Sequence, residues 1–503
     1  MAFIKSTSLY KSGKSTKGLY LGKTEAEGEN NPGQGLKEYY EDFLDIDSAV
    51  VDGRFLLIGR KGVGKSAYVK HLSDNSSLEN DILCSVVRSD GVKLQQVLQA
   101  IPEEVENKAS LIYEWIILTE MVKLLLANTN IRYSEGYDAL QKFETRNSGV
   151  VNVDKWMSVS ENETRDVSVN CYDLVKVFPV LFGKHIDRST HKAPFYRIIP
   201  SLRNVVIKML GYDANKGINF IIVFDDLDIN FDLKDEKHKK ELMDLIRVSR
   251  DYNETYFPNR DIRILLMLRD DIAMQLDGVA SDSNKIISSY KYRLQWYDSV
   301  KEAADENSKL RKFINKRIEI GFDKLGIKYD RQDPWRSLVD ETTIGEYDGK
   351  SAFKFVLDCT FYRPRDLVAL FEHIGEYNLK LPLSPTDIKK LIKEYVIWNA
   401  REVKDELSNR YTTEQISNLF SIFKDVSNVK NGYDYAKLIN NLKSIGMSEK
   451  DFDLLVDYNL LVPRDDWKRQ YYSYRESVRI EDPENYTYRL PKSLYLYFKP
   501  HTV

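Results

Sequence analysis

A glycine-rich loop with a lysine and a serine at its end is the part of this sequence best suited to chemistry. The segment RFLLIGRKGVGKSAYV, residues 54–69, meets the spacing GxxxxGK(S/T) between an apolar strand-like run and a helix-like run. Glycines let successive backbone N–H groups face one anion, and the helix N-terminus behind them adds a positive dipole end. We therefore expect Lys65 to reach the β- and γ-phosphates of a nucleotide, and the Ser66 hydroxyl to bind Mg²⁺. The expected phosphate-binding residues are Gly59, Arg60, Lys61, Gly62, Val63, Gly64, Lys65, Ser66 and Ala67.

Two neighbouring carboxylates follow a second apolar run, INFIIVFDDLD, which spans residues 218–228. So continuous an apolar run is typical of a parallel strand buried on both faces, and such sheets bind ligands at the carboxyl ends of their strands. We expect Asp225 to hold Mg²⁺ through water and Asp226 to orient or deprotonate an attacking water. A strand that ends in two acids is common by chance, so the presence of Lys65 is what favours this interpretation.

Composition sets limits on the class of protein. The chain has 503 residues, 30% of them charged, and a net charge of −3, which argues against a globally basic nucleic-acid binder. The three cysteines and six histidines are scattered, so neither a disulfide framework nor a zinc site is indicated. The most apolar helix candidate, residues 111–127, is too short and too charged to span a bilayer. We expect a soluble cytoplasmic protein without membrane attachment.

Taken together, GRKGVGKS, IIVFDDLD, LLMLRDD and FYRPRDLVALF resemble the STAND and KAP branch of P-loop ATPases, which is related to AAA+ proteins, over about residues 36–375. The resemblance implies ATPase activity with ATP and Mg²⁺; no GTPase-type NKxD motif follows the acidic pair. The chain departs from KAP proteins by lacking membrane helices between the two motifs, and from large STAND sensors by lacking a repeat array. Its general character is similar to that of stand-alone bacterial ATPases found beside anti-phage effector genes.

The same resemblance suggests roles for arginines, each with an ordinary alternative. Arg269 follows the apolar run 262–268 and would sense the γ-phosphate, which makes Lys65, Asp226 and Arg269 the expected catalytic residues. Its alternative is an ion pair with Asp270 or Asp271. Within KIISSYKYRLQW, Arg293 could act in trans on a neighbouring subunit, although a short strand or helix on the core is the favoured interpretation.

Two more arginines flank Pro364, a residue that favours a helix start. In related ATPases an arginine at such a start in the helical lid reaches back to the nucleotide. Arg365 is the first candidate for this second sensor and Arg363 is the second. The alternative is pairing with Asp366 or Asp358.

The elements that must position these residues predict an α/β fold: a P-loop NTPase parallel sheet flanked by helices, then a helical lid and a winged-helix-like domain. Three short helices followed by a hairpin, formed by residues 470–480 and 486–490, suggest the winged-helix outline. The expected parts are a flexible N-terminal arm (1–34), a P-loop ATPase core (35–300) with a helical insertion around 100–215, a helical lid (301–380) and the C-terminal domain (381–503).

The sequence therefore predicts an ATP-binding and ATP-hydrolysing switch whose nucleotide state controls assembly with a partner. The expected partners are further copies of the chain, an effector protein, or both. Residues 464–503 hold eight Lys or Arg and six Asp or Glu. This near balance leaves nucleic acid as a further possible partner of the C-terminal region, so a DNA-binding initiator or loader ATPase is one alternative. A nucleotide-stabilised scaffold without turnover is another.

Overall fold

The computed structural model describes residues 15–88, 98, 101–152, 167–182, 191–227, 235–257, 259–276, 278–297, 307–342, 344–408, 410–467, 469–472 and 482–502. The chain divides into two compact units. The sheet unit comprises Asp45–Lys61 and Lys65–Leu294. The helical unit comprises Met1–Leu44, Gly62–Gly64 and Gln295–Val503, so it includes both the expected lid and the expected C-terminal domain.

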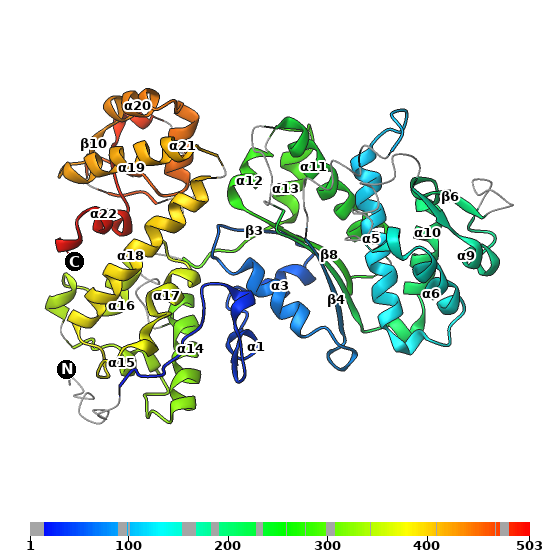
Figure 1. Ribbon diagram of the computed structural model, residues 1–503, viewed down its shortest axis with the longest axis horizontal. Helices are drawn as coiled ribbons and strands as arrows, with labels where there is room; N and C mark the ends of the chain where they lie inside the picture. Colours follow the sequence, from blue (N-terminus) through cyan, green and yellow to red (C-terminus); the bar gives the residue numbers. More distant parts are fainter. Residues whose placement is uncertain are drawn as a thin grey trace. The chain divides into compact units, whose positions relative to one another are not determined.

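A five-stranded parallel sheet lies at the centre of the sheet unit, with the strand order β4-β7-β8-β3-β9. Its central strands β7 and β8 each contain a run of five apolar residues, as expected for strands covered on both faces. Figure 1 shows α3 on one side of this sheet and α11 on the other. The predicted α/β class is thereby confirmed. The strands are β3 (Leu56–Ile58), β4 (Ile82–Arg88), β7 (Asn219–Asp225), β8 (Ile262–Leu268) and β9 (Lys291–Arg293).

Helices joined to this sheet complete the sheet unit. Those beside or between the strands are α2 (Ile46–Val51), α3 (Lys65–Asp74), η2 (Leu78–Asn80), α11 (Glu236–Asp251), η5 (Tyr252–Tyr256), α12 (Asp270–Gln275) and α13 (Ser283–Tyr290). Between β4 and β7, where the sequence predicts a helical insertion, the described residues form helices and a small antiparallel pair, β5 and β6. Its elements are α5 (Lys108–Ala127), η3 (Thr129–Ile131), α6 (Tyr137–Arg146), α7 (Ser148–Val151), β5 (Ser168–Asn170), α9 (Tyr172–Val177), β6 (Lys192–Pro194), α10 (Phe195–Leu210) and η4 (Asp213–Asn215).

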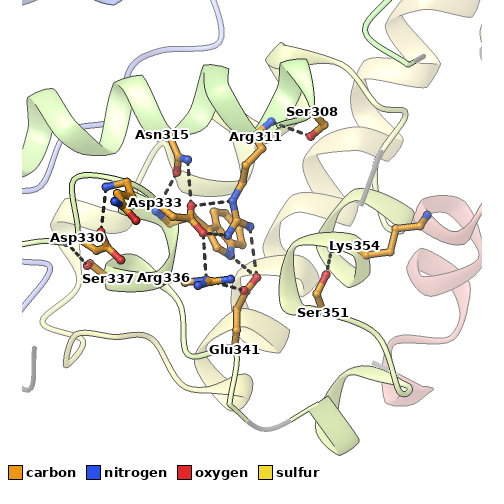
Figure 2. A network of polar contacts seen from close by, with 12 residues as sticks. Ser308, Arg311, Asn315, Asp330, Asp333, Arg336, Ser337, Glu341, Ser351 and Lys354 are labelled. Atoms are coloured by element: carbon orange, nitrogen blue, oxygen red, sulfur yellow. Dashed lines mark hydrogen bonds and ion pairs between the residues drawn. The ribbon is translucent and has the colours of Figure 1, made fainter. Parts of the chain in front are cut away.

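The first part of the helical unit is a helical domain with a buried core. Its helices are α14 (Lys309–Leu325), α15 (Pro334–Leu338), η7 (Ile344–Tyr347), α16 (Ala352–Asp358), α17 (Pro364–Phe371), η8 (Ile374–Glu376) and α18 (Pro385–Ser408). Inside this core Arg311, 2% exposed, donates two hydrogen bonds to Asp333, 3.0 Å from Nε to Oδ1 and 2.6 Å from Nη2 to Oδ2 (Figure 2). Asn315 donates to the same carboxylate over 3.0 Å. This ion pair therefore fixes α14 against the start of α15.

The N-terminal segment, residues 15–34, packs against the same helical core. Leu19 and Leu21 are buried in it. Glu29, 1% exposed, accepts two hydrogen bonds from Arg317 on α14, over 2.7 and 3.1 Å. The sequence predicts a flexible arm here because the segment is rich in polar residues. Residues 15–34 are nevertheless packed, because two leucines and one buried carboxylate contact the helical core. The segment and its continuation contain η1 (Ala26–Gly28), β1 (Asn30–Asn31), β2 (Gln34–Gly35) and α1 (Leu36–Tyr39).

The C-terminal part has the winged-helix order of helix, strand, two helices and two strands, with the sheet order β10-β12-β11. Of the predicted hairpin, the strand at 486–490 is present as β12, which pairs with β10 and β11, whereas most of the other predicted strand, 470–480, lies outside the described residues. The strands β10 and β11 were not predicted, because strands of two or three residues are too short for a period-two pattern to reveal them. The elements are α19 (Thr413–Asn428), β10 (Tyr433–Asp434), α20 (Tyr435–Ser444), α21 (Glu449–Asp457), β11 (Val462–Arg464), η9 (Pro483–Asn485), β12 (Thr487–Arg489), α22 (Lys492–Phe498) and η10 (Pro500–Thr502).

Candidate nucleotide-binding site

The glycine-rich loop connects β3 to α3, as its sequence predicts. Gly62 and Gly64 adopt φ values of +83° and +104°, which residues with a Cβ rarely adopt. The backbone N–H of Gly59 donates to the carbonyl of Leu268 over 3.1 Å, so the loop begins beside the carboxyl end of β8. The loop therefore has the backbone conformation for which the motif requires glycine, at the edge of the sheet where ligands bind.

Lys65, the first residue of α3, lies folded over this loop. Its Nζ donates to the carbonyl oxygens of Gly59 and Arg60, over 2.7 and 3.2 Å. Both acceptors are neutral, and an ammonium group binds a phosphate oxygen more strongly than a carbonyl oxygen. The next side chain, Ser66, is exposed in the first turn of α3. Lys61 and Ala67 are half-buried.

The two carboxylates differ in their surroundings. Asp225, the last residue of β7, is 3% exposed. Asp226 has φ of +54° and lies 3.4 Å from Nε of Arg88, measured to Oδ2. Arg88 ends β4, in register with Asp225, so the neighbouring strand supplies this cation. Sequence reasoning missed Arg88, because only the pairing of β4 with β7 brings it to the acidic pair.

Arg269 follows β8, the strand that lies between β7 and β3. Its guanidinium forms a bidentate ion pair with Asp271, 3.0 Å from Nε to Oδ1 and 2.9 Å from Nη2 to Oδ2. Both side chains are largely buried, with 11% and 7% exposed. The alternative that the sequence left open, pairing with a following aspartate, is therefore present in the structure. The position at the sheet edge beside the loop agrees with the sensing role, which stays a prediction.

Arg293 ends β9, in register with Ile58 at the end of β3. Its Nη2 lies 3.2 Å from Oδ2 of Asp270. It therefore belongs to a short strand at the edge of the sheet, as the favoured interpretation expected, and its side chain is 39% exposed.

The two arginines at the start of α17 have different partners. Arg363 binds Asp366, which is fully buried, over 3.1 Å from Nε and 2.8 Å from Nη2. Burial alone would lower the pKa of Arg363, but the attraction of Asp366 outweighs it and raises that pKa. Arg363 therefore holds the helix start together.

Arg365 instead lies against the loop. Its backbone N–H donates to the carbonyl of Gly62 over 3.4 Å, and a Cβ added to Gly62 would come within 2.9 Å of the Arg365 Cβ. Its Nη1 lies 3.0 Å from Oε2 of Glu402 on α18. On the next residue of the loop, the Val63 carbonyl accepts a hydrogen bond of 2.8 Å from the indole of Trp296. Glu402 and Trp296 were not among the expected site residues, because no local motif marks them.

Among the described residues there is no group of three or more His, Cys, Asp and Glu side chains able to hold a metal ion. No helix in the described parts of the chain is long and apolar enough to cross a membrane.

Fold and site together define an α/β protein with a parallel five-stranded sheet, a glycine-rich loop at its carboxyl edge, and a helical C-terminal region with a small antiparallel sheet. Residues 308–404, from the N-cap of α14 to within α18, match the family described as the FunZ-associated C-terminal helical domain. The chain is also 23% identical over 325 residues to the "Putative transposon gamma-delta 80.3 kDa protein" of Escherichia coli strain K12. That alignment covers 63% of this chain and 41% of the E. coli protein, so the match spans less than half of that relative.

Proposed function

We propose that this chain is a Mg²⁺-dependent ATPase that works as a molecular switch. The observation that carries the proposal is the loop itself: Gly62 and Gly64 adopt positive φ values, and Lys65 lies over the loop with its Nζ on the carbonyl oxygens of Gly59 and Arg60. Lys65 would exchange those carbonyls for phosphate oxygens. The loop amides and the N-terminus of α3 would contribute further positive partial charge.

The acidic pair would supply the other half of the chemistry. Ser66 and Asp225 would hold Mg²⁺, which neutralises phosphate oxygens when bound. Asp226 would accept a hydrogen bond from the attacking water, and Arg88 would keep its carboxylate in place. Arg269 would stabilise charge on the γ-phosphate, at the cost of sharing its guanidinium with Asp271.

A switch also needs an output. Nucleotide can shift a conformational equilibrium only by its difference in affinity for the two states, so ATP must bind the assembled or closed state more tightly by several kcal/mol. The resemblance to stand-alone bacterial ATPases points to an effector protein as the partner. ATP-dependent co-elution with the product of a neighbouring gene would support that setting, and co-elution independent of nucleotide would count against it.

Phosphate release by wild type and Lys65→Ala tests the proposed activity. Turnover should fall at least about 100-fold in the variant, because the group that binds the transferred phosphate is lost. Lys70→Ala is the matched control, since Lys70 lies on the same helix but pairs with Asp74 at the surface. Light scattering with and without ATP reports assembly. Turnover that survives in Lys65→Ala would refute the proposal.

Two alternatives remain distinguishable. The winged-helix order of the C-terminal elements favours a DNA-binding ATPase, but the exposed side chains of α21 include Glu449 and Asp453, which disfavour insertion of that helix into a groove. Duplex binding that weakens steeply with salt would support it. A scaffold without turnover would retain nucleotide through purification, and Asp226→Asn would leave it unchanged.

A further inference from the structure

The loop tip and the C-terminal domain are connected by a short chain of contacts inside the helical unit. The connection begins at the start of α17, where Asp366 accepts a hydrogen bond of 3.0 Å from the N–H of Phe361 and also binds Arg363. This buried arrangement fixes the first turn of α17. Within that turn, the backbone N–H of Arg365 donates a hydrogen bond to the carbonyl oxygen of Gly62.

The side chain of Arg365 leads from there to α18. Its guanidinium binds Glu402, over 3.0 Å, and lies 5.8 Å from the ring centroid of Trp398, one turn earlier on that helix. The two charged side chains are 16% and 22% exposed, so the pair is partly screened by solvent. Nε of Arg365 is buried and has no hydrogen-bond partner among the described residues. A guanidinium with an unused donor beside a phosphate-binding loop can bind another anion.

Helix α18 is shared by two cores. The buried residues of its first half, among them Ile388 and Tyr395, belong to the core of the helical domain. Those of its second half, Ala400, Val403 and Leu407, belong to the core of the C-terminal domain. Figure 1 shows α18 running from beside α17 to the C-terminal helices. Glu402 therefore lies on the part of α18 that packs against the C-terminal domain.

From this arrangement we infer that Glu402 competes with nucleotide phosphate for Arg365. Without nucleotide, the ion pair holds the second half of α18 to the start of α17. With nucleotide in the loop, Arg365 turns to the phosphate and releases Glu402, so that the C-terminal core loses one of its attachments to the helix beside the loop. Glu402 is thus a regulatory residue that lowers nucleotide affinity and couples it to the C-terminal domain. The inference rests on the proposed nucleotide binding.

The full-length chain carrying Glu402→Gln tests this competition, with a fluorescent ATP analogue as the probe. The variant should bind the analogue about fivefold more tightly, since a partly exposed ion pair of this kind contributes a factor of this order. Asp405→Asn is the matched control, because Asp405 is exposed on the same helix and the substitution removes the same charge. Its affinity should stay that of wild type. If Glu402→Gln does not fold, Glu402→Asp should give a smaller change in the same direction.

Amide hydrogen exchange of residues 400–407 provides the second readout. The analogue should speed exchange there in wild type, and Glu402→Gln should exchange faster without any nucleotide. Unchanged affinity and exchange in Glu402→Gln, while Lys65→Ala loses binding, would overturn the competition and leave the proposed function intact. Failure of the wild type to bind the analogue would overturn both.

Discussion

Replacing Asp333 by asparagine should destabilise the helical domain strongly. Arg311 is 2% exposed and makes two hydrogen bonds to this carboxylate, and Asn315 makes a third. An asparagine keeps one acceptor but turns an N–H₂ group toward the guanidinium, so the buried cation loses its full counter-charge. Glu341, 3.3 Å from Nη1 of Arg311, compensates only partly (Figure 2).

Breaking a buried ion pair by removing one partner costs roughly 3–5 kcal/mol, and the remaining Glu341 places this case near about 3 kcal/mol. For a unit of this size that corresponds to a fall in Tm of about 6–12 °C. Differential scanning calorimetry of the full chain measures the change. Because two units can unfold separately, the transition of the helical unit is followed by amide hydrogen exchange of α14, the helix that carries Arg311.

Asp348→Asn is the control for this prediction. It makes the same chemical change at an exposed aspartate that pairs with Lys492, with 67% of the aspartate side chain exposed. Asparagine also tolerates its φ of +56°. We expect a change of at most about 0.5 kcal/mol there. Equal Tm values for the two variants would refute the reasoning, since burial would then not decide the cost.

Two further predictions concern pH and the loop. Burial would raise the pKa of Asp358, but Lys354 and Tyr362 outweigh burial and lower that pKa. The ionised carboxylate therefore stabilises the fold above the unfolded pKa of about 3.9, and this stabilisation is lost as the pH falls through the pKa of the folded state. Asp358→Asn should therefore lower Tm at pH 7 and converge with wild type near pH 2; parallel curves would contradict this. Gly62→Ala should weaken binding of a fluorescent ATP analogue about tenfold or more without unfolding the chain, because its φ is +83° and Arg365 leaves no room for a Cβ; unchanged affinity would show that the loop tolerates a side chain.

The strands and loop of the sheet unit were predictable because their signals are local. Apolar runs of five residues mark β7 and β8, and the spacing of Gly59, Gly64, Lys65 and Ser66 needs no distant residue to be recognised. The short strand β11 was missed, since it exists only through pairing with β12 across a long connection. Arg88 and Glu402 were missed for the same reason. Each contacts a residue of a neighbouring strand or helix that lies far away in the sequence.

The residues of the glycine-rich loop and the carboxylates at the end of β7 could be read from the sequence, because backbone sterics and the apolar pattern of a buried strand depend on neighbours in the chain. Which arginine lies at the loop depends on the fold. The sequence only ranks Arg365 before Arg363; in the fold a fully buried carboxylate, Asp366, binds Arg363, while the backbone of Arg365 meets Gly62. Ion pairing is a competition among all charges within a few ångströms, and the fold alone sets which charges those are.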